Sequence, residues 1–183
     1  MIRLFPGQED TMTLWVAVML VMTAQAAPAS SAASSVASIR TAHEAVQGFL
    51  SKAASMVSED LYAFKPTPEV RSMGELFAHV ADANFGICGM ASGQKPPMSG
   101  IEKSKKTKAE LTEALAESFK FCDAAFAGLT DANANETVKF FLPGTHTKLG
   151  VLAFNNAHQF EHYGNIVTYM RMKGMVPPSS AGK

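Results

Sequence analysis

The chain has 183 residues, enough for one ordinary domain with a real core, and equal numbers of basic and acidic residues, 16 each, give it a formal net charge of zero. A nucleic-acid surface would need a clustered basic excess, so we predict no nucleic-acid partner. Two cysteines, Cys88 and Cys122, are too few for a disulfide-stapled miniprotein or a thiolate metal cluster.

The start of the chain predicts an export signal. Leu14 to Met22 form a short apolar run, and Ala24-Gln25-Ala26 after it fits a small-residue cleavage site. The run is far shorter than the roughly 20 residues with which a helix crosses a bilayer, so we predict no stable membrane span. Residues 1–26 are interpreted as a signal peptide and residues 27–35 as a flexible linker. The protein is therefore expected to be periplasmic or secreted; the alternative is an uncleaved, disordered leader.

The first helix of the mature domain is predicted from about Val36 to just before Ser58. Its inward face recurs at intervals of three and four residues, as the helical period requires; it consists of Ile39, His43, Val46, Leu50 and Ala53. We interpret His43 as a core residue, with a place in a pocket lining as the alternative. Residues 61–67 form a connector that neighbouring prolines keep extended.

A capping box marks the start of a second helix. Ser72 is followed three residues later by Glu75, the spacing at which each side chain accepts a hydrogen bond from the other residue's backbone. His79 lies on the apolar stripe of this helix, which is expected to fade near Gly89–Gly93. Residues 91–106 are then rich in glycine, proline and lysine, and they predict a loop.

A second capping box opens a third helix at Thr107, and Gly128 is expected to stop it. Residues 138–142 are compatible with a short extended piece or with a loop. A fourth helix is predicted from Thr147 to Lys173, with a glycine and two prolines after its end. Four amphipathic segments without convincing strands predict an all-α four-helix bundle over residues 36–180.

Three histidines on inward faces are the candidate metal ligands. His158 and His162 lie four residues apart, hence on one face and one turn apart. If the second and fourth helices are neighbours, His79 joins them inside the bundle. Three neutral imidazoles suit Zn²⁺ or Ni²⁺ and leave a fourth position open for water, a thiolate or a carbonyl. A lone histidine on an apolar face is more often a hydrogen-bonded core residue, so a bundle that binds no metal is the alternative.

The segment from His158 to His162 also matches H-x-x-E-H, a zinc-protease signature whose glutamate is the general base. Few residues follow His162, which leaves little room for a further acidic ligand on another element. We therefore expect Glu161 on the solvent side, with a role as a base or as a partner of a ligand left open.

Several other polar residues have expected roles near this site. Asp82 and Asn155 lie one turn from predicted ligands in their own helices, and we expect them to orient those histidines. His146 is expected in a loop near the mouth of the bundle, exposed to solvent. Cys88 and Cys122 are interpreted as buried small apolar groups, with a disulfide as the minority alternative that export would permit.

With these residues identified, the chain resembles the DinB superfamily of DinB/YfiT-like metalloenzymes. Two blocks carry the resemblance, LYAFKPTPEVRSMGELFAHVADANF at 61–85 and HQFEHYGNIVTYMRMKGMVPPSS at 158–180, and it covers about residues 35–180. It implies a four-helix bundle in which the second helix supplies one histidine ligand and the last helix supplies an H-x-x-x-H pair. The matching positions are His79, His158 and His162.

The resemblance also implies an activity. Characterised relatives include metal-dependent thiol S-transferases and a thiol-dependent maleylpyruvate isomerase, in which the metal activates a thiolate. We therefore expect a divalent-metal protein that acts as a transferase or hydrolase on a small molecule; an export signal departs from the cytosolic thiol chemistry of such relatives. The alternative is a non-catalytic bundle that binds a metal or small ligand. A homodimer is the expected assembly.

Overall fold

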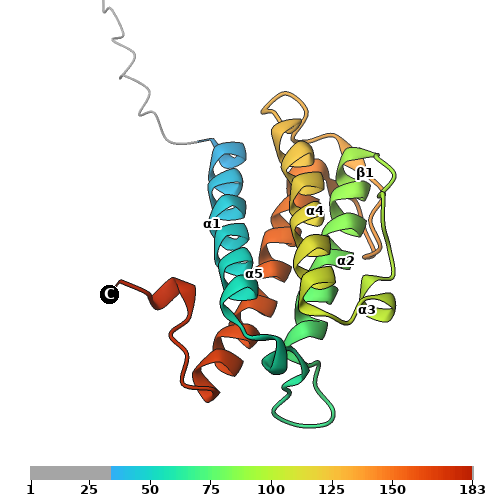
Figure 1. Ribbon diagram of the computed structural model, residues 1–183. Coiled ribbons are helices and arrows are strands. Elements are labelled where there is room, and N and C mark those ends of the chain that lie inside the picture. The colour runs from blue at the N-terminus through green and yellow to red at the C-terminus, as the bar shows by residue number, and fades with distance from the viewer. Residues whose placement is uncertain (1–33, 183) are drawn as a thin grey trace, which may run out of the picture. The chain divides into compact units, whose positions relative to one another are not determined.

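The computed structural model describes residues 34–182 of the chain (Figure 1). The predicted signal peptide and nearly all of the predicted linker lie outside the described residues. Four long helices dominate the described part: α1 (Ser35–Met56), α2 (Met73–Ser92), α4 (Lys108–Ala127) and α5 (Lys148–Met172). The prediction of an all-α four-helix bundle is confirmed, and the four helices begin within two residues of where the sequence placed them.

Both predicted capping boxes are formed. In α2 the Ser72 hydroxyl accepts the Glu75 N–H at 3.2 Å, and the Glu75 carboxylate accepts the Ser72 N–H at 2.7 Å. In α4 the same exchange joins Thr107 and Glu110. Hydrogen bonds from the backbone N–H and the hydroxyl of Thr107, and from the backbone N–H of Lys106, lower the pKa of Glu110 to about 2. The N-terminal ends of these helices are thus fixed by local sequence, because the first turn of a helix leaves backbone N–H groups that need acceptors.

Short elements join the long helices: η1 (Glu59–Ala63), α3 (Ile101–Ser104), β1 (Thr137–Val138), β2 (His146–Thr147) and η2 (Pro178–Ser180). The two strands pair antiparallel, with Val138 opposite His146. Residues 138–142 therefore begin in an extended piece and continue as a loop.

The prediction of a loop over 91–106 is wrong at α3, and the reason is tertiary. The carboxylate of Asp82, on α2, accepts the backbone N–H groups of Ile101 and Glu102 at 2.9 Å each. These are donors that the first turn of a helix leaves unpaired. A distant side chain therefore caps α3, and no local pattern could have revealed it.

Helices α1 and α2 each pack against both α4 and α5, so α1 and α2 lie at opposite corners of the bundle. The predicted site required α2 and α5 to be neighbours, and they are.

His43 faces the core: its Nε2–H donates to Asp123 at 3.0 Å, and its ring stacks on Phe126 with centroids 3.9 Å apart. Burial lowers the pKa of His43 despite the neighbouring Asp123, so it is a neutral core residue, as predicted.

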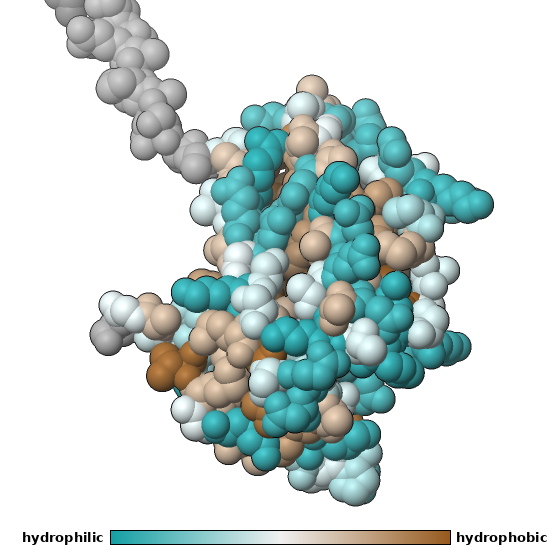
Figure 2. Space-filling model, viewed as in Figure 1, coloured by the Kyte–Doolittle hydropathy of each residue, from teal (hydrophilic) through white to brown (hydrophobic). Residues whose placement is uncertain are grey.

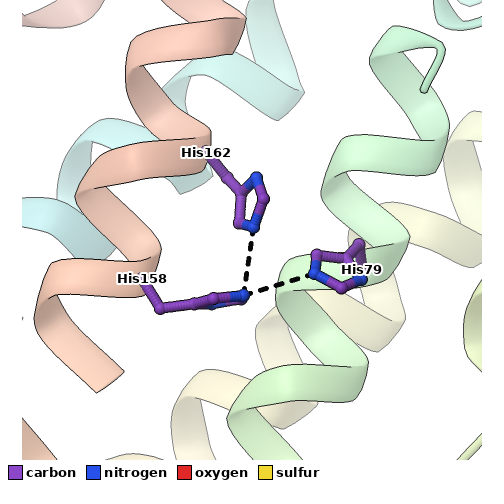
Figure 3. A group of neighbouring side chains, drawn as sticks. All are labelled: His79, His158 and His162. Carbon is purple, nitrogen blue, oxygen red and sulfur yellow. Dashed lines mark hydrogen bonds between the residues drawn. The ribbon is translucent and has the colours of Figure 1, made fainter. Parts of the chain in front are cut away.

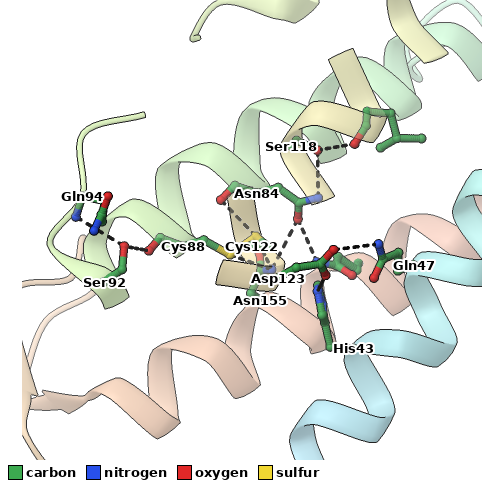
Figure 4. The surroundings of a disulfide bond; sticks show 12 residues. His43, Gln47, Asn84, Cys88, Ser92, Gln94, Ser118, Cys122, Asp123 and Asn155 are labelled. Carbon is green, nitrogen blue, oxygen red and sulfur yellow. Dashed lines mark hydrogen bonds and ion pairs between the residues drawn. A yellow bond between two sulfur atoms is a disulfide. The ribbon is translucent and has the colours of Figure 1, made fainter. Parts of the chain in front are cut away.

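Cys88 of α2 and Cys122 of α4 form a disulfide inside the bundle (Figure 4). The expectation of two separate buried thiols is therefore wrong, although both residues are fully buried. The pairing depends on α2 and α4 lying side by side, which brings the two Cα atoms to 5.3 Å, within the range that a disulfide spans. The number of residues between the two cysteines does not predict this distance in space.

Of the helices in residues 34–182, none combines the length and apolar character that crossing a membrane requires. The face seen in Figure 2 is mainly hydrophilic over α1 and α4. Hydrophobic side chains gather near the C-terminal end in the same view. Met172 and Val176 are among the well-exposed hydrophobic residues of the described chain. The helices are thus amphipathic in the sense that the sequence pattern indicated.

We expect the disulfide to contribute strongly to stability, because it closes a loop with a sequence separation of 34 residues. Loop-closure entropy for that length corresponds to about 3–4 kcal/mol. Urea denaturation of the wild type, oxidised and then reduced, should show a loss of this order. The double variant Cys88→Ala/Cys122→Ala should be insensitive to reductant. An unchanged wild-type midpoint after complete reduction, verified by thiol titration, would contradict the expectation.

Candidate metal centre

His79 projects from α2, and His158 and His162 project from α5, into the space where these two helices meet (Figure 3). The Nε2 atom of His158 lies 3.2 Å from Nε2 of His79 and 3.0 Å from Nε2 of His162. One ligand nitrogen from each residue lies within 4.8 Å of the other two. The structure therefore brings together the three histidines that the sequence singled out.

The spacing of these nitrogens fits a shared metal ion. Three nitrogens bound to one tetrahedral Zn²⁺ at about 2.0–2.1 Å would lie about 3.3 Å apart. The two Nε2–Nε2 separations to His158 are 3.0 and 3.2 Å. Three imidazole nitrogens this close together form a donor set that borderline divalent cations prefer.

Burial keeps two of the three histidines, His158 and His162, neutral. It lowers the pKa of His158 to about 4, with His162, His79 and Arg71 contributing further by charge repulsion. Burial also lowers the pKa of His162, and His79 adds to the effect. Both rings are consequently neutral near pH 7 and keep a lone pair for a ligand.

Glu102 joins the candidate site although the sequence pattern does not predict it. Its Oε2 accepts a hydrogen bond from Nδ1–H of His79 at 3.2 Å, and its Oε1 accepts one from Arg71 at 2.7 Å. Burial opposes ionisation of Glu102, but the hydrogen bond and charge of Arg71, with His79, hold its pKa below the usual value. An ionised carboxylate on Nδ1 fixes the tautomer in which Nε2 of His79 is free to bind metal.

The sequence offers only weak evidence for a role of Glu102 in the site. It is the one acidic residue in the lysine-rich segment 91–106, which was interpreted as a loop. Its approach to His79 depends on α3, and α3 depends on its cap from Asp82. Among the described residues, Nδ1 of His158 and of His162 has no hydrogen-bond partner, so His79 alone is oriented by a carboxylate.

The expected orienting roles of Asp82 and Asn155 are not what the structure shows. Asp82 bonds to the backbone N–H groups of Ile101 and Glu102 in α3, and its contact with His79 is indirect, through the residue Glu102. The side-chain amide of Asn155 donates to Asn84 at 3.3 Å and lies 3.5 Å from a disulfide sulfur. Three positions rotate a helix by about 300°, so Asn155 and His158 point about 60° apart. That rotation turns Asn155 into the core.

Glu161 is exposed, on the solvent side as expected. It lines a surface depression of about 520 Å³ that reaches His162 and also includes Arg71 and Glu102.

The expectation of an exposed loop position for His146 is wrong. His146 belongs to β2, is only partly exposed, and donates from Nε2 to the carbonyls of Leu142 and Pro143 at 3.1 Å each. Backbone acceptors in its own turn hold it there.

Comparisons with known proteins agree with this architecture. A family model described as the DinB superfamily matches residues 30–166. Comparison with curated protein sequences finds no match. A DinB-like protein from Bacillus subtilis shares the fold with a TM-score of 0.63 at 18% identity, over 80% of this chain and 99% of that one.

Two further solved structures share the fold. A DinB-like protein from Bacillus cereus aligns with a TM-score of 0.66 at 15% identity, over 76% of this chain and 93% of that one. The mycothiol-dependent maleylpyruvate isomerase aligns with a TM-score of 0.59 at 14% identity, over 72% of this chain and 60% of that one. At these identities the likeness is one of fold.

The neutral state of His158 predicts a pH-dependent stability of the metal-free protein. Its pKa is about 4 in the fold against the ordinary 6.5, so only the unfolded chain takes up this proton between those values. The free energy of unfolding should therefore fall as pH decreases through that window. The loss is about 1–2 kcal/mol, less than the full linkage because the ring keeps some solvent contact.

Urea denaturation with a chelator at several pH values from about 7 to about 4.5 measures this loss. Other acidic groups also titrate in that range, so the test is the difference between the wild type and His158→Gln. The variant should lose less stability than the wild type. Parallel pH profiles for the two proteins would contradict the assignment of a depressed pKa to His158.

Proposed function

The chain belongs to the DinB superfamily, and from this premise we propose that it binds a divalent metal ion, zinc or nickel, through His79, His158 and His162. The convergence of three Nε2 atoms from α2 and α5 is the observation that carries the proposal. Glu102 orients one ligand, and burial keeps the other two neutral. A three-histidine set leaves at least one coordination position for another group.

We propose that the protein is a metal-dependent transferase or hydrolase of a small molecule. When bound, the ion would supply a Lewis-acidic position that activates a thiol or water, or polarises a carbonyl. The chain itself supplies neutral ligands, a fixed tautomer at His79 and an open approach beside His162. The isomerase that shares this fold is mycothiol-dependent, which supports chemistry of this kind.

A non-catalytic metal or small-ligand binding protein is the second candidate. The charged and polar lining of the depression beside His162 supports it, because such side chains can also hold a small ligand without turnover. The lining consists of Glu69, Val70, Arg71, Leu76, Glu102, Glu161, His162, Asn165 and Tyr169.

Metal binding should fall in a graded series. We expect the wild type to take up about one Zn²⁺ per chain and His162→Ala to lose measurable binding. Glu102→Gln should bind about 10-fold to 100-fold more weakly, because the charged partner of His79 is lost. Glu161→Gln removes the same charge from the same depression without removing a hydrogen bond to a histidine, and it should bind nearly as the wild type does. Titration calorimetry of the metal-free proteins measures each affinity.

Zinc uptake below about 0.2 ion per chain, unchanged by His162→Ala, would contradict the proposal that the protein binds a metal. Where metal binds, a screen with thiol acceptors and with ester and amide substrates separates the two candidates. Turnover that disappears with chelator and in His162→Ala supports the enzyme. Turnover that persists after chelation counts against metal catalysis, and stoichiometric metal without turnover favours the binding protein.

We further propose that the protein is exported to the periplasm or secreted. The apolar run and cleavage site near the start of the chain support this proposal. So does the buried disulfide, because disulfides persist in oxidising compartments and are rare in the cytosol. Mass spectrometry of fractionated bacterial cells should find the chain outside the cytosol, beginning near residue 27. Intact chain confined to the cytosol would refute the proposal.

A further inference from the structure

A cluster of aromatic side chains lies directly beside His158. Phe154 is one turn earlier on α5, and its ring is nearly parallel to that of His158, with an interplanar angle of 21° and centroids 6.4 Å apart. The connection between β1 and β2 covers Phe154 with its own apolar residues. We call Phe140, Phe141 and Leu142 the aromatic tip of this connection.

The rings form a continuous apolar surface from the aromatic tip to the metal centre. Phe154 packs edge-to-face against Phe140, with centroids 5.2 Å apart, and against Phe141, with centroids 5.8 Å apart. Phe140 and Phe141 are themselves 4.2 Å apart. Edge-to-face contacts of this kind are favourable beyond the area they bury. The candidate ligand His158 is thus the end of an aromatic row.

The aromatic tip is held in place by its own turn. Nε2–H of His146 donates to the carbonyls of Leu142 and Pro143, and its ring packs against Phe140 with centroids 5.1 Å apart. Pairing of β1 with β2 closes the base of the connection. An ion pair between Lys148 and Glu136 lies beside that pairing. The connection therefore has a defined structure.

Two residues of the aromatic tip leave much apolar surface uncovered. Phe141 is 58% exposed and Leu142 is 40% exposed, although Phe140 and Phe154 pack against the core. Covering a fixed, exposed apolar surface with an apolar group lowers the free energy, because apolar area is removed from water. The depression at His162 is lined instead by the charged side chains of Arg71, Glu102 and Glu161. The metal centre therefore has an apolar surface beside one ligand and a charged one beside another.

We propose that the substrate of the metal centre carries an aromatic or similarly apolar group that packs on Phe141 and Phe154. Its polar, metal-binding group lies at the three histidines. This inference rests on the proposed function, since it names the class of small molecule that the metal centre accepts. Phe141 determines specificity; it does not hold the metal.

Two hydroxamates test the proposal, because they bring the same metal-binding group with and without a ring. Acetohydroxamate and benzohydroxamate are titrated into the zinc-loaded protein by calorimetry. We expect benzohydroxamate to bind about 10-fold more tightly, the gain for covering an exposed aromatic surface with a ring. Phe141→Ser should reduce this preference to about 2-fold and leave the zinc stoichiometry unchanged.

Phe160→Ser is the matched control. It removes another exposed phenylalanine, from the outer face of α5, and the preference should persist in it. Equal affinities of the wild type for both probes, or a preference that Phe141→Ser does not change, would overturn the inference while zinc binding still stands. Failure to bind zinc would overturn the proposed function and the inference with it.

Light scattering on the same proteins tests a different occupant of the surface. If Phe141→Ser converts a dimer into a monomer and leaves the preference between the probes unchanged, the aromatic tip contacts a second copy of the chain. That outcome also overturns the inference. An unchanged assembly with a reduced preference supports it.

Discussion

The packing of α2 against α5 is the constraint on which the candidate site depends, because it brings Nε2 of His158 within hydrogen-bonding distance of Nε2 of His79 and of His162. A buried polar network holds this packing in register. Asn84 of α2 accepts hydrogen bonds from Gln159 at 2.8 Å and from Asn155 at 3.3 Å, both on α5. Asn84 also donates to Ser118 of α4 at 3.1 Å. Hydrogen bonds in a low-dielectric interior are strong, and they specify one arrangement of the helices.

The surroundings of the three histidines are asymmetric, and the asymmetry has a physical origin. Charge is concentrated around His79 and His162, where Glu102, Arg71 and Glu161 face solvent. Aromatic residues lie beside His158. Phe154 precedes it by one helical turn, and the connection between β1 and β2 packs against Phe154. One centre thus combines an electrostatic and an apolar environment, as small-molecule sites commonly do.

Features with a local cause were predictable. The capping boxes at Ser72 and Thr107 start their helices because the partners lie three residues apart in the chain. The spacing of His158 and His162 fixes their common face. The helices themselves followed from apolar periodicity, and with them the inward position of His79. Two features that depend on a distance between elements were not predicted: the Cys88–Cys122 disulfide and the contact of Glu102 with His79.

The sequence by itself therefore determined the four long helices, their ends and the three histidines on their inward faces, because helical period and capping act within a few residues. Only the tertiary structure decided which helices are neighbours, and hence that the three imidazoles meet. It also decided that Asp82 caps α3 and that Glu102 reaches His79. These contacts join residues about 20 positions apart, and the separation in space depends on the packing of the whole bundle.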